Sequence, residues 1–296
     1  MRFEAIAPPD VVYQAGYHDG ANEFGWRYTD ASRQEYELAL AHRRLDWVEV
    51  HRPPGAMVDI GGGAGHLVAA AGERGWTATL VEPVERTVAF ATRAFGVDAV
   101  CGGIEHVEAC ADRYDLISLV HVLEHFPEPV DHLRRLRSRL TERGALFVEV
   151  PNYRSLARRW LGDRWMGWRA GEHVHQFTRK TLHATLRGAG YDVVATRTMV
   201  PAWSGLGPAA NAHFLGVEPL LEAVVSKRHG RLRVRARTLD ANGVAATAWR
   251  PPAPRPVRES RGLRRVVYGT GFSALRAMEE ATGLGSNLLA LARALP

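Results

Sequence analysis

The sequence predicts an α/β fold, a doubly wound and mostly parallel sheet with helices on both faces. Short apolar runs of strand length alternate along the chain with amphipathic segments of helix length. The run Tyr114–Val120 is apolar almost throughout, as expected of a strand buried on both faces of a parallel sheet. In the stretch Met57–Leu67, a short apolar run leads into four glycines over five positions and then into an Ala-rich segment. That order is typical of a buried strand, a tight turn and a helix.

The glycines of this stretch follow a specific pattern. The dinucleotide-binding pattern G-x-G-x-x-G fails from either start, because its last position is His66 or Val68. The pattern present is D-x-G-x-G-x-G, which begins at Asp59. The next expected strand, Trp76–Val81, ends in Glu82-Pro83, so an acid follows the glycines by about twenty residues. An acid at this place can accept hydrogen bonds from both hydroxyls of a ribose.

These two features resemble the cofactor-binding motifs of the class I S-adenosylmethionine (AdoMet) methyltransferases. The resemblance implies AdoMet as cofactor and a seven-stranded sheet of order 3-2-1-4-5-7-6 whose last strand is antiparallel. The cofactor contacts that it implies are Asp59, Gly61, Gly62, Gly63, Ala64, Gly65, Glu82, Pro83, Gly103, Ile104, Glu105 and His121. Gly103 stands where the family commonly has an adenine-binding Asp, so we expect adenine recognition through backbone groups, Ile104 and Glu105.

Composition limits the class of protein. The chain has 296 residues, of which 46% are apolar, enough for a large core in one or two domains. The first ten residues carry no apolar run of a secretory leader, and no run approaches membrane-spanning length, so we expect a cytoplasmic protein. The two cysteines, Cys101 and Cys110, form no CxxC motif, which suits a reducing compartment and offers no zinc site.

We expect four consecutive parts: an N-terminal arm and helix (1–50), an AdoMet-binding core (51–200), a lid or insertion between strands six and seven (201–284) and a final core strand (285–296). Asp30 or Ser32 can cap the first helix, which should run to about Val48. The resemblance implies that Tyr28, in the arm, lies over the methionine end of the cofactor. Packing of this aromatic ring on the core is the alternative.

The core has the following expected elements. Helices are expected at 67–74, 84–94, 130–140 and 178–187, and strands at 57–60, 76–81, 97–100, 114–120, 145–150, 191–199 and 286–294.

Two further segments resemble one small-molecule branch of the family. His121–Pro127 reads HVLEHFP and resembles the signature of the ubiquinone-type and many antibiotic and sugar methyltransferases. Gly171–Thr178 reads GEHVHQFT and resembles an element that covers the substrate pocket in that branch. His121 follows a strand directly, where open α/β sheets place their ligands. We therefore expect His121 and His173 to meet the acceptor from two sides and to take its proton.

The remaining aromatic residues and histidines of these segments form the expected substrate pocket. It comprises Tyr28, His125, Trp165, Trp168 and His175. Two tryptophans among glycines favour an aromatic-walled acceptor site, with packing in a core as the alternative. Glu124 and His125 equally suit a structural role, in which they orient the loop after the strand.

A metal site is a further alternative. Some relatives hold a divalent ion with a Glu-x-x-Glu-His version of the signature, and this chain has His121 in place of the first Glu. His121, Glu124 and His125, helped by His173 or His175, could bind a transition metal. The missing carboxylate argues against magnesium, which prefers oxygen ligands. We expect no metal.

The net charge of +6 is unevenly distributed. Residues 226–265 carry twelve Lys/Arg and two acids, a net charge of +10, which leaves −4 for the rest of the chain. Four arginines alternate in the run Arg231–Arg237. Such a segment steers an anionic or carrier-bound acceptor, or else only coats a solvated surface.

These features together predict an AdoMet-dependent methyltransferase of a small or medium-sized metabolite, with O-methylation in natural-product biosynthesis as the first expectation. N- or C-methylation, and a repurposed cyclase or binding protein that does not methylate, are the alternatives. The lack of an Asn-Pro-Pro-aromatic or Pro-Cys motif disfavours a nucleic-acid acceptor. No membrane partner is expected, and a homodimer stays open.

Overall fold

The protein is described from a computed structural model, for residues 31–165, 167–169, 172–201 and 276–295. Its strands are β1 (Ala56–Ile60), β2 (Thr77–Glu82), β3 (Asp98–Cys101), β4 (Tyr114–Val120), β5 (Leu140–Pro151), β6 (Tyr191–Met199) and β7 (Asn287–Ala294). Its helices are α2 (Ala31–Glu49), α3 (His66–Glu73), α4 (Glu85–Phe95), α5 (Ile104–Ala109), α6 (Pro129–Arg137), α7 (Leu156–Leu161) and α8 (Arg179–Gly188). Short 3-10 turns lie at η1 (Leu123–His125) and η2 (Gly162–Arg164), and a last helix occupies residues 276–282.

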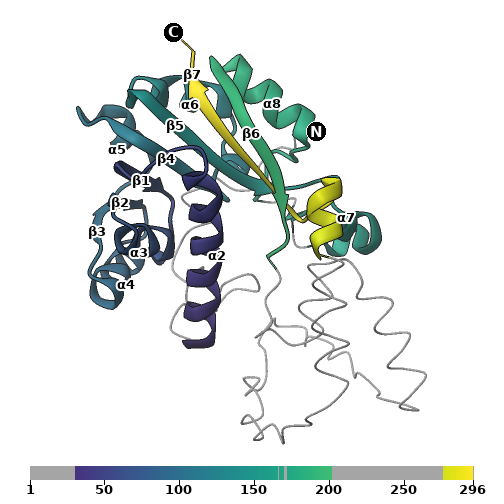
Figure 1. The fold of residues 1–296 in the computed structure, drawn as a ribbon, viewed down its shortest axis with the longest axis horizontal. Helices are drawn as coiled ribbons and strands as arrows, with labels where there is room; N and C mark the ends of the chain where they lie inside the picture. The colour runs from purple at the N-terminus through teal and green to yellow at the C-terminus, as the bar shows by residue number, and fades with distance from the viewer. Residues whose placement is uncertain (1–30, 166, 170–171, 202–275, 296) are drawn as a thin grey trace, which may run out of the picture.

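The strands form one sheet of order β3-β2-β1-β4-β5-β7-β6. The pairs from β3 across to β5 are parallel, and β7 runs antiparallel to both β5 and β6. The predicted fold class and strand order are therefore confirmed. In Figure 1 the strands cross the middle of the molecule, and β7 lies between β5 and β6.

Helices cover both faces of the sheet. Successive residues of a strand point to opposite faces, so each strand contributes side chains to two apolar clusters. Met57 packs with buried residues of α2 and α3, whereas its neighbour Val58 packs with buried residues of α5, α6 and α8. The same alternation places Leu116 in the first cluster and Ile117 in the second. Helix α2 lies across the sheet in Figure 1, on the face that it shares with α3.

The element bounds agree with the prediction except around β5 and in two short helices. The helix expected at 130–140 ends at Arg137. Strand β5 begins at Leu140, earlier than expected, because Leu140 already pairs with Tyr114 of β4 ahead of an irregularity in the pairing of the two strands. Helices α5 and α7 have six residues each, too few for their sequences to show a helical period.

The arm at residues 1–30, with Tyr28, and most of the insertion, including the basic segment, lie outside the described residues. Among the helices that are described, none combines the length and the apolar character that crossing a membrane requires.

Candidate active site

Between β1 and α3 the glycines bring bare backbone to the carboxyl edge of the sheet. Gly61 has a φ of 67°, which favours glycine, and a Cβ there would come within 2.7 Å of the Val122 side chain. At Gly62 a Cβ would lie 2.2 Å from Oδ2 of Asp59. Side chains are therefore excluded from both positions by their protein neighbours, and the backbone of the turn is left bare.

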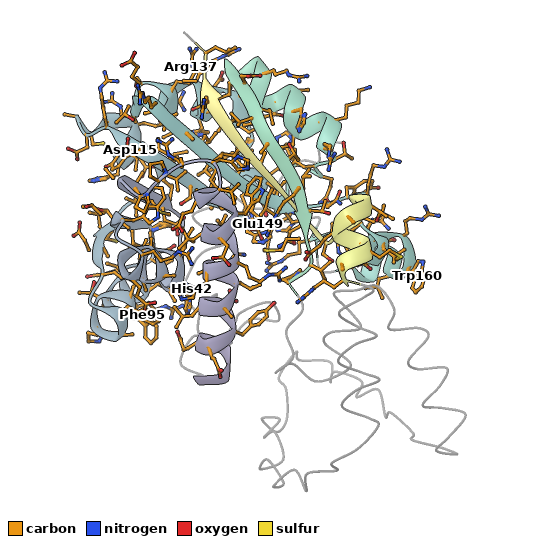
Figure 2. The ribbon with its side chains drawn as sticks, in the orientation of Figure 1. His42, Phe95, Asp115, Arg137, Glu149 and Trp160 are labelled. Atoms are coloured by element: carbon orange, nitrogen blue, oxygen red, sulfur yellow. The ribbon has the colours of Figure 1, made fainter. Side chains whose placement is uncertain are left out.

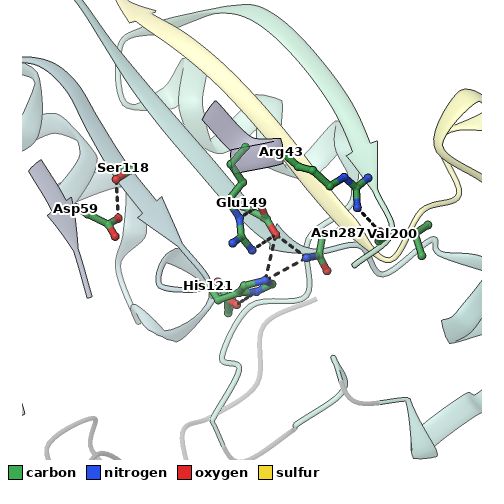
Figure 3. A network of polar contacts seen from close by, with 9 residues as sticks. Arg43, Asp59, Ser118, His121, Glu149, Val200 and Asn287 are labelled. Carbon is green, nitrogen blue, oxygen red and sulfur yellow. Dashed lines mark hydrogen bonds and ion pairs between the residues drawn. The ribbon is translucent and has the colours of Figure 1, made fainter. Parts of the chain in front are cut away.

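Asp59 lies at the end of β1 and is buried, with only 1% of its surface exposed. Its register partner in β4 is Ser118, whose hydroxyl donates a hydrogen bond of 2.5 Å to its carboxylate (Figure 3). Burial raises the pKa of Asp59 to about 7, although the bond from Ser118 and the charge of Arg44 act in the opposite direction. A cationic or hydrogen-donating ligand group at this place would favour the ionised form.

Glu82 ends the neighbouring strand β2. Its carboxylate accepts hydrogen bonds from the backbone N–H of Gly63 (3.0 Å) and of Val84 (3.1 Å), so it joins the glycine turn to the start of α4. Burial raises the pKa of Glu82 to about 7, against the lowering effect of these two bonds. Two buried carboxylates thus lie at the carboxyl ends of adjacent strands.

The loop after β3 lies beside the same edge. The N–H of Gly102 donates to the carbonyl of Glu82 at 3.2 Å, and Ile104 is buried at the start of α5. The Glu105 carboxylate accepts from the N–H of Gly103 at 3.0 Å, while Pro83 is exposed. The predicted cofactor residues of the glycine turn, the end of β2 and this loop therefore lie at the same edge of the sheet, where the parallel strands end.

His121 follows β4 directly and has a φ of 56°, the one positive φ of a non-glycine residue within the described residues. Histidine tolerates this conformation better than most residues, yet it costs free energy and often marks a functional site. The ring lies between two carboxylates, and its Nδ1 is 3.3 Å from Glu124. Its Nε2 is 3.3 Å from Glu149, a contact that Figure 3 marks with a dashed line. The side chain is 38% exposed, so it remains open to a ligand.

Both carboxylates control the charge of His121. Burial by itself would lower its pKa, but hydrogen bonds and attraction from Glu124 and Glu149 outweigh it and raise the pKa to about 9. At neutral pH the imidazole therefore carries a proton on each nitrogen and donates to both carboxylates.

Glu149 is itself held by a buried arginine. It is fully buried in β5, and Figure 2 shows it in the interior of the molecule. Arg44 of α2 donates to both of its oxygens, at 2.8 and 3.0 Å, and Asn287 at the start of β7 donates at 2.5 Å. Burial would raise the pKa of Glu149, but the charges of Arg44 and His121 and their hydrogen bonds together outweigh this and hold the pKa well below its usual range. Residues of α2, β5 and β7 thus position His121.

His125 and His173 do not lie on the open side. Both are buried and stack edge to face, with ring centroids 4.8 Å apart. Burial lowers both pKa values, that of His173 to about 3, so both rings are neutral. His175 is half-buried, and its backbone N–H donates to the carbonyl of Glu124 at 3.1 Å. The segment before α8 therefore packs against the turn η1.

The predicted tryptophans lie in a small cluster beside α7. Trp165 is buried and packs with Ala157 and Leu161, which agrees with the core-packing alternative for that residue. Trp168 is half-buried, with the Arg158 guanidinium 4.6 Å from its ring centroid. Tyr28, the fifth predicted substrate residue, lies outside the described residues.

The sequence analysis did not predict four polar residues of the site: Arg44, Ser118, Glu149 and Asn287. Glu149 had a usable signal, because a charged residue inside the apolar run 145–150 needs a buried partner. Ser118 interrupts its strand in the same way. Nothing in the local sequence marks Arg44 or Asn287.

Comparison with known proteins identifies the family. The family model described as "Methyltransferase domain" matches residues 31–196, more than half of the chain. No curated protein matches the chain.

Several solved structures are similar to this chain at low sequence identity. A SAM-dependent methyltransferase from Archaeoglobus fulgidus is 15% identical, covers 86% of this chain and 93% of its own, and has a TM-score of 0.51. The 1,6-didemethyltoxoflavin-N1-methyltransferase of Burkholderia thailandensis is 21% identical over 67% of this chain and 85% of its own, with a TM-score of 0.46. A possible histamine N-methyltransferase from Thermotoga maritima is 24% identical over 60% and 88%, with a TM-score of 0.44. The chain therefore belongs to the methyltransferase-domain family and is an enzyme whose cofactor is AdoMet.

Proposed function

We propose that this enzyme methylates a hydroxyl group of a small or medium-sized metabolite, in natural-product biosynthesis. The observation that carries the proposal is the arrangement of two groups at one edge of the sheet. The glycine turn, Asp59 and Glu82 occupy the ends of β1 and β2, and the partly exposed His121 occupies the end of β4, the other neighbour of β1. A cofactor and an acceptor can therefore meet between them.

The residues of the first group fit AdoMet. The glycine turn has no Cβ to obstruct a ligand, and the two carboxylates offer buried acceptors for hydroxyl or ammonium donors. We propose that the glycine turn with Ala64, together with Pro83 and the loop Gly103–Glu105, completes this binding site. When bound, AdoMet supplies an electrophilic methyl group whose bond to sulfur breaks as the acceptor oxygen attacks.

His121 is the residue that we propose for the acceptor's proton. Because Glu124 and Glu149 hold His121 protonated at neutral pH and accept from both of its N–H groups, the ring must first give one of these protons to solvent. After that proton has passed to solvent, the same ring can take the acceptor's own proton. Its fixed position contributes as well, since orienting the reactants supplies much of the rate of such a displacement.

The other predicted residues have supporting roles in the proposal. His175 of the covering segment, Trp168 and Tyr28 border the acceptor in this proposal. The buried His125, His173 and Trp165 hold the segments around it in place. The basic segment 226–265 favours an anionic or carrier-bound acceptor through its charge. N- or C-methylation by the same site, and a repurposed protein that does not methylate, are the alternatives.

The test is an incubation of the enzyme with methyl-labelled AdoMet and a metabolite extract of its own host. We expect S-adenosylhomocysteine and one labelled small molecule, whose methyl carbon has the chemical shift of an O-methyl group. An anionic acceptor should react more slowly at 1 M than at 0.1 M salt, because charge steering is screened.

The Glu82→Ala variant is the control and should give little product. A labelled N-methyl or C-methyl group would contradict O-methylation. Cofactor binding without any labelled product, in extracts from several growth conditions, would favour the repurposed protein.

A further inference from the structure

A cluster of side chains that could bind a metal ion lies next to His121 and includes its partner Glu124. Glu124 and His125 belong to the turn η1, and His173 belongs to the segment before α8. All three are buried, with exposed fractions of 0%, 7% and 5%. Each offers one metal-ligating atom, and these atoms lie within 4.8 Å of one another. Three such atoms can surround a single ion.

The hydrogen bonds of the two histidines fix which nitrogen can act as ligand. Nδ1 of His125 is 3.1 Å from the carbonyl oxygen of Glu172, and Nδ1 of His173 is 3.0 Å from that of Gly167. A carbonyl only accepts, so each Nδ1 carries the proton and donates, which leaves the lone pair on Nε2. Metal-binding histidines commonly have this second interaction, because it orients the ring and sets the tautomer.

Glu124 supplies the charge that a cation would need. Its Oε1 takes part in the contact with His121, whereas its Oε2 is buried and has no hydrogen-bond partner among the described residues. A carboxylate oxygen that is buried without a partner costs free energy. A cation bound to Oε2 would remove that cost without disturbing the contact of Oε1.

We propose that Glu124, His125 and His173 bind one divalent transition-metal ion, such as Zn²⁺. Two imidazoles and one carboxylate suit Zn²⁺ and similar ions, whereas Mg²⁺ requires mostly oxygen ligands. The ion joins the covering segment to η1 and, through Glu124, supports the turn that carries His121. Metal binding of this kind does not depend on the identity of the methyl acceptor.

The test uses untagged protein that has been stripped with a chelator, refilled with Zn²⁺ and passed over a desalting column. We expect one zinc per chain by elemental analysis, a higher melting temperature after refilling, and no such effect from Mg²⁺. Refilling with Co²⁺ should give visible absorption bands typical of nitrogen and oxygen ligands.

Variants locate the site. Glu124→Gln and His173→Gln should each weaken zinc binding about a hundredfold or more, because each removes a ligand, whereas His132→Gln should not. His132 is a matched control, because it also pairs with a carboxylate, Glu108 at 2.7 Å, but lies outside the cluster.

Three outcomes would overturn the proposal: no retained zinc in the refilled wild-type chain, wild-type binding by folded Glu124→Gln and His173→Gln, or preference for Mg²⁺ over Zn²⁺. If a variant fails to fold, as judged by circular dichroism, the zinc content and the cobalt spectrum of the wild-type chain decide.

Discussion

Replacing Arg44 with Met is expected to lower the free energy of unfolding by about 3–5 kcal/mol, because it leaves Glu149 buried without its main cation. Glu149 is fully buried, and Arg44 is 7% exposed, so water cannot take the place of the guanidinium. Arg44 also donates two of the hydrogen bonds that the carboxylate accepts. Chemical denaturation of the two proteins, followed by circular dichroism, measures the difference.

The control for this prediction is Arg43→Met on the same helix. Arg43 pairs with Glu280 at 2.8 Å, but the two side chains are 27% and 26% exposed. Solvent screening then limits the loss to about 1 kcal/mol or less. The double variant Arg44→Met/Glu149→Gln should recover part of the loss, because it removes the uncompensated charge. Equal losses of unfolding free energy from Arg44→Met and Arg43→Met would show that the buried ion pair contributes no more to stability than the partly exposed one.

Replacing His121 with Asn is expected to lower turnover about a hundredfold or more, the usual contribution of a general acid or base. Asn also tolerates a positive φ, so the turn after β4 keeps its conformation while the imidazole is lost. The affinity for S-adenosylhomocysteine should change no more than a few fold. Steady-state kinetics and calorimetry separate the two effects.

His42→Asn is the matched control. His42 is a histidine of α2 whose side chain is 38% exposed, like that of His121, and it also pairs with a carboxylate, Glu73 at 3.4 Å. Its turnover should stay within about twofold of wild type, as surface substitutions usually do little. A His121→Asn enzyme that turns over like wild type would exclude His121 from the chemistry.

The sequence predicted the fold well because its signals are local. The glycine pattern after Asp59, the acid at Glu82 and the apolar run Tyr114–Val120 each depend on a few adjacent residues. Apolar runs and turn residues of this kind determine which segments become strands, and the strands lie in the sheet in the predicted order. The start of β5 was missed because its first residues, Leu140–Gly144, include polar residues and a glycine and so do not resemble a buried strand.

The site was predicted less completely, because its contacts join distant residues. Arg44 meets Glu149 across 105 positions of the chain, and Asn287 meets Glu149 across 138. A charge within an apolar strand shows that a partner is needed but not which one. Burial of individual side chains is equally hard to read: Trp165 was expected in an acceptor pocket and packs in a small core beside α7.

The central claim, that Asp59 and Glu82 hold AdoMet at the ends of β1 and β2, is tested most directly by calorimetric titration with S-adenosylhomocysteine. At about pH 8 the wild-type chain should bind one molecule, and Asp59→Ala and Glu82→Ala should each bind tenfold or more weakly, since a hydrogen bond to a charged group contributes about 1.5–3 kcal/mol.

Burial raises both carboxyl pKa values to about 7. Both groups therefore gain protons and lose acceptor capacity as the pH falls, and wild-type affinity should drop between about pH 8 and pH 6. Each variant lacks one of the two groups and should show a smaller drop. Unchanged affinity in both variants at about pH 8 would contradict the claim.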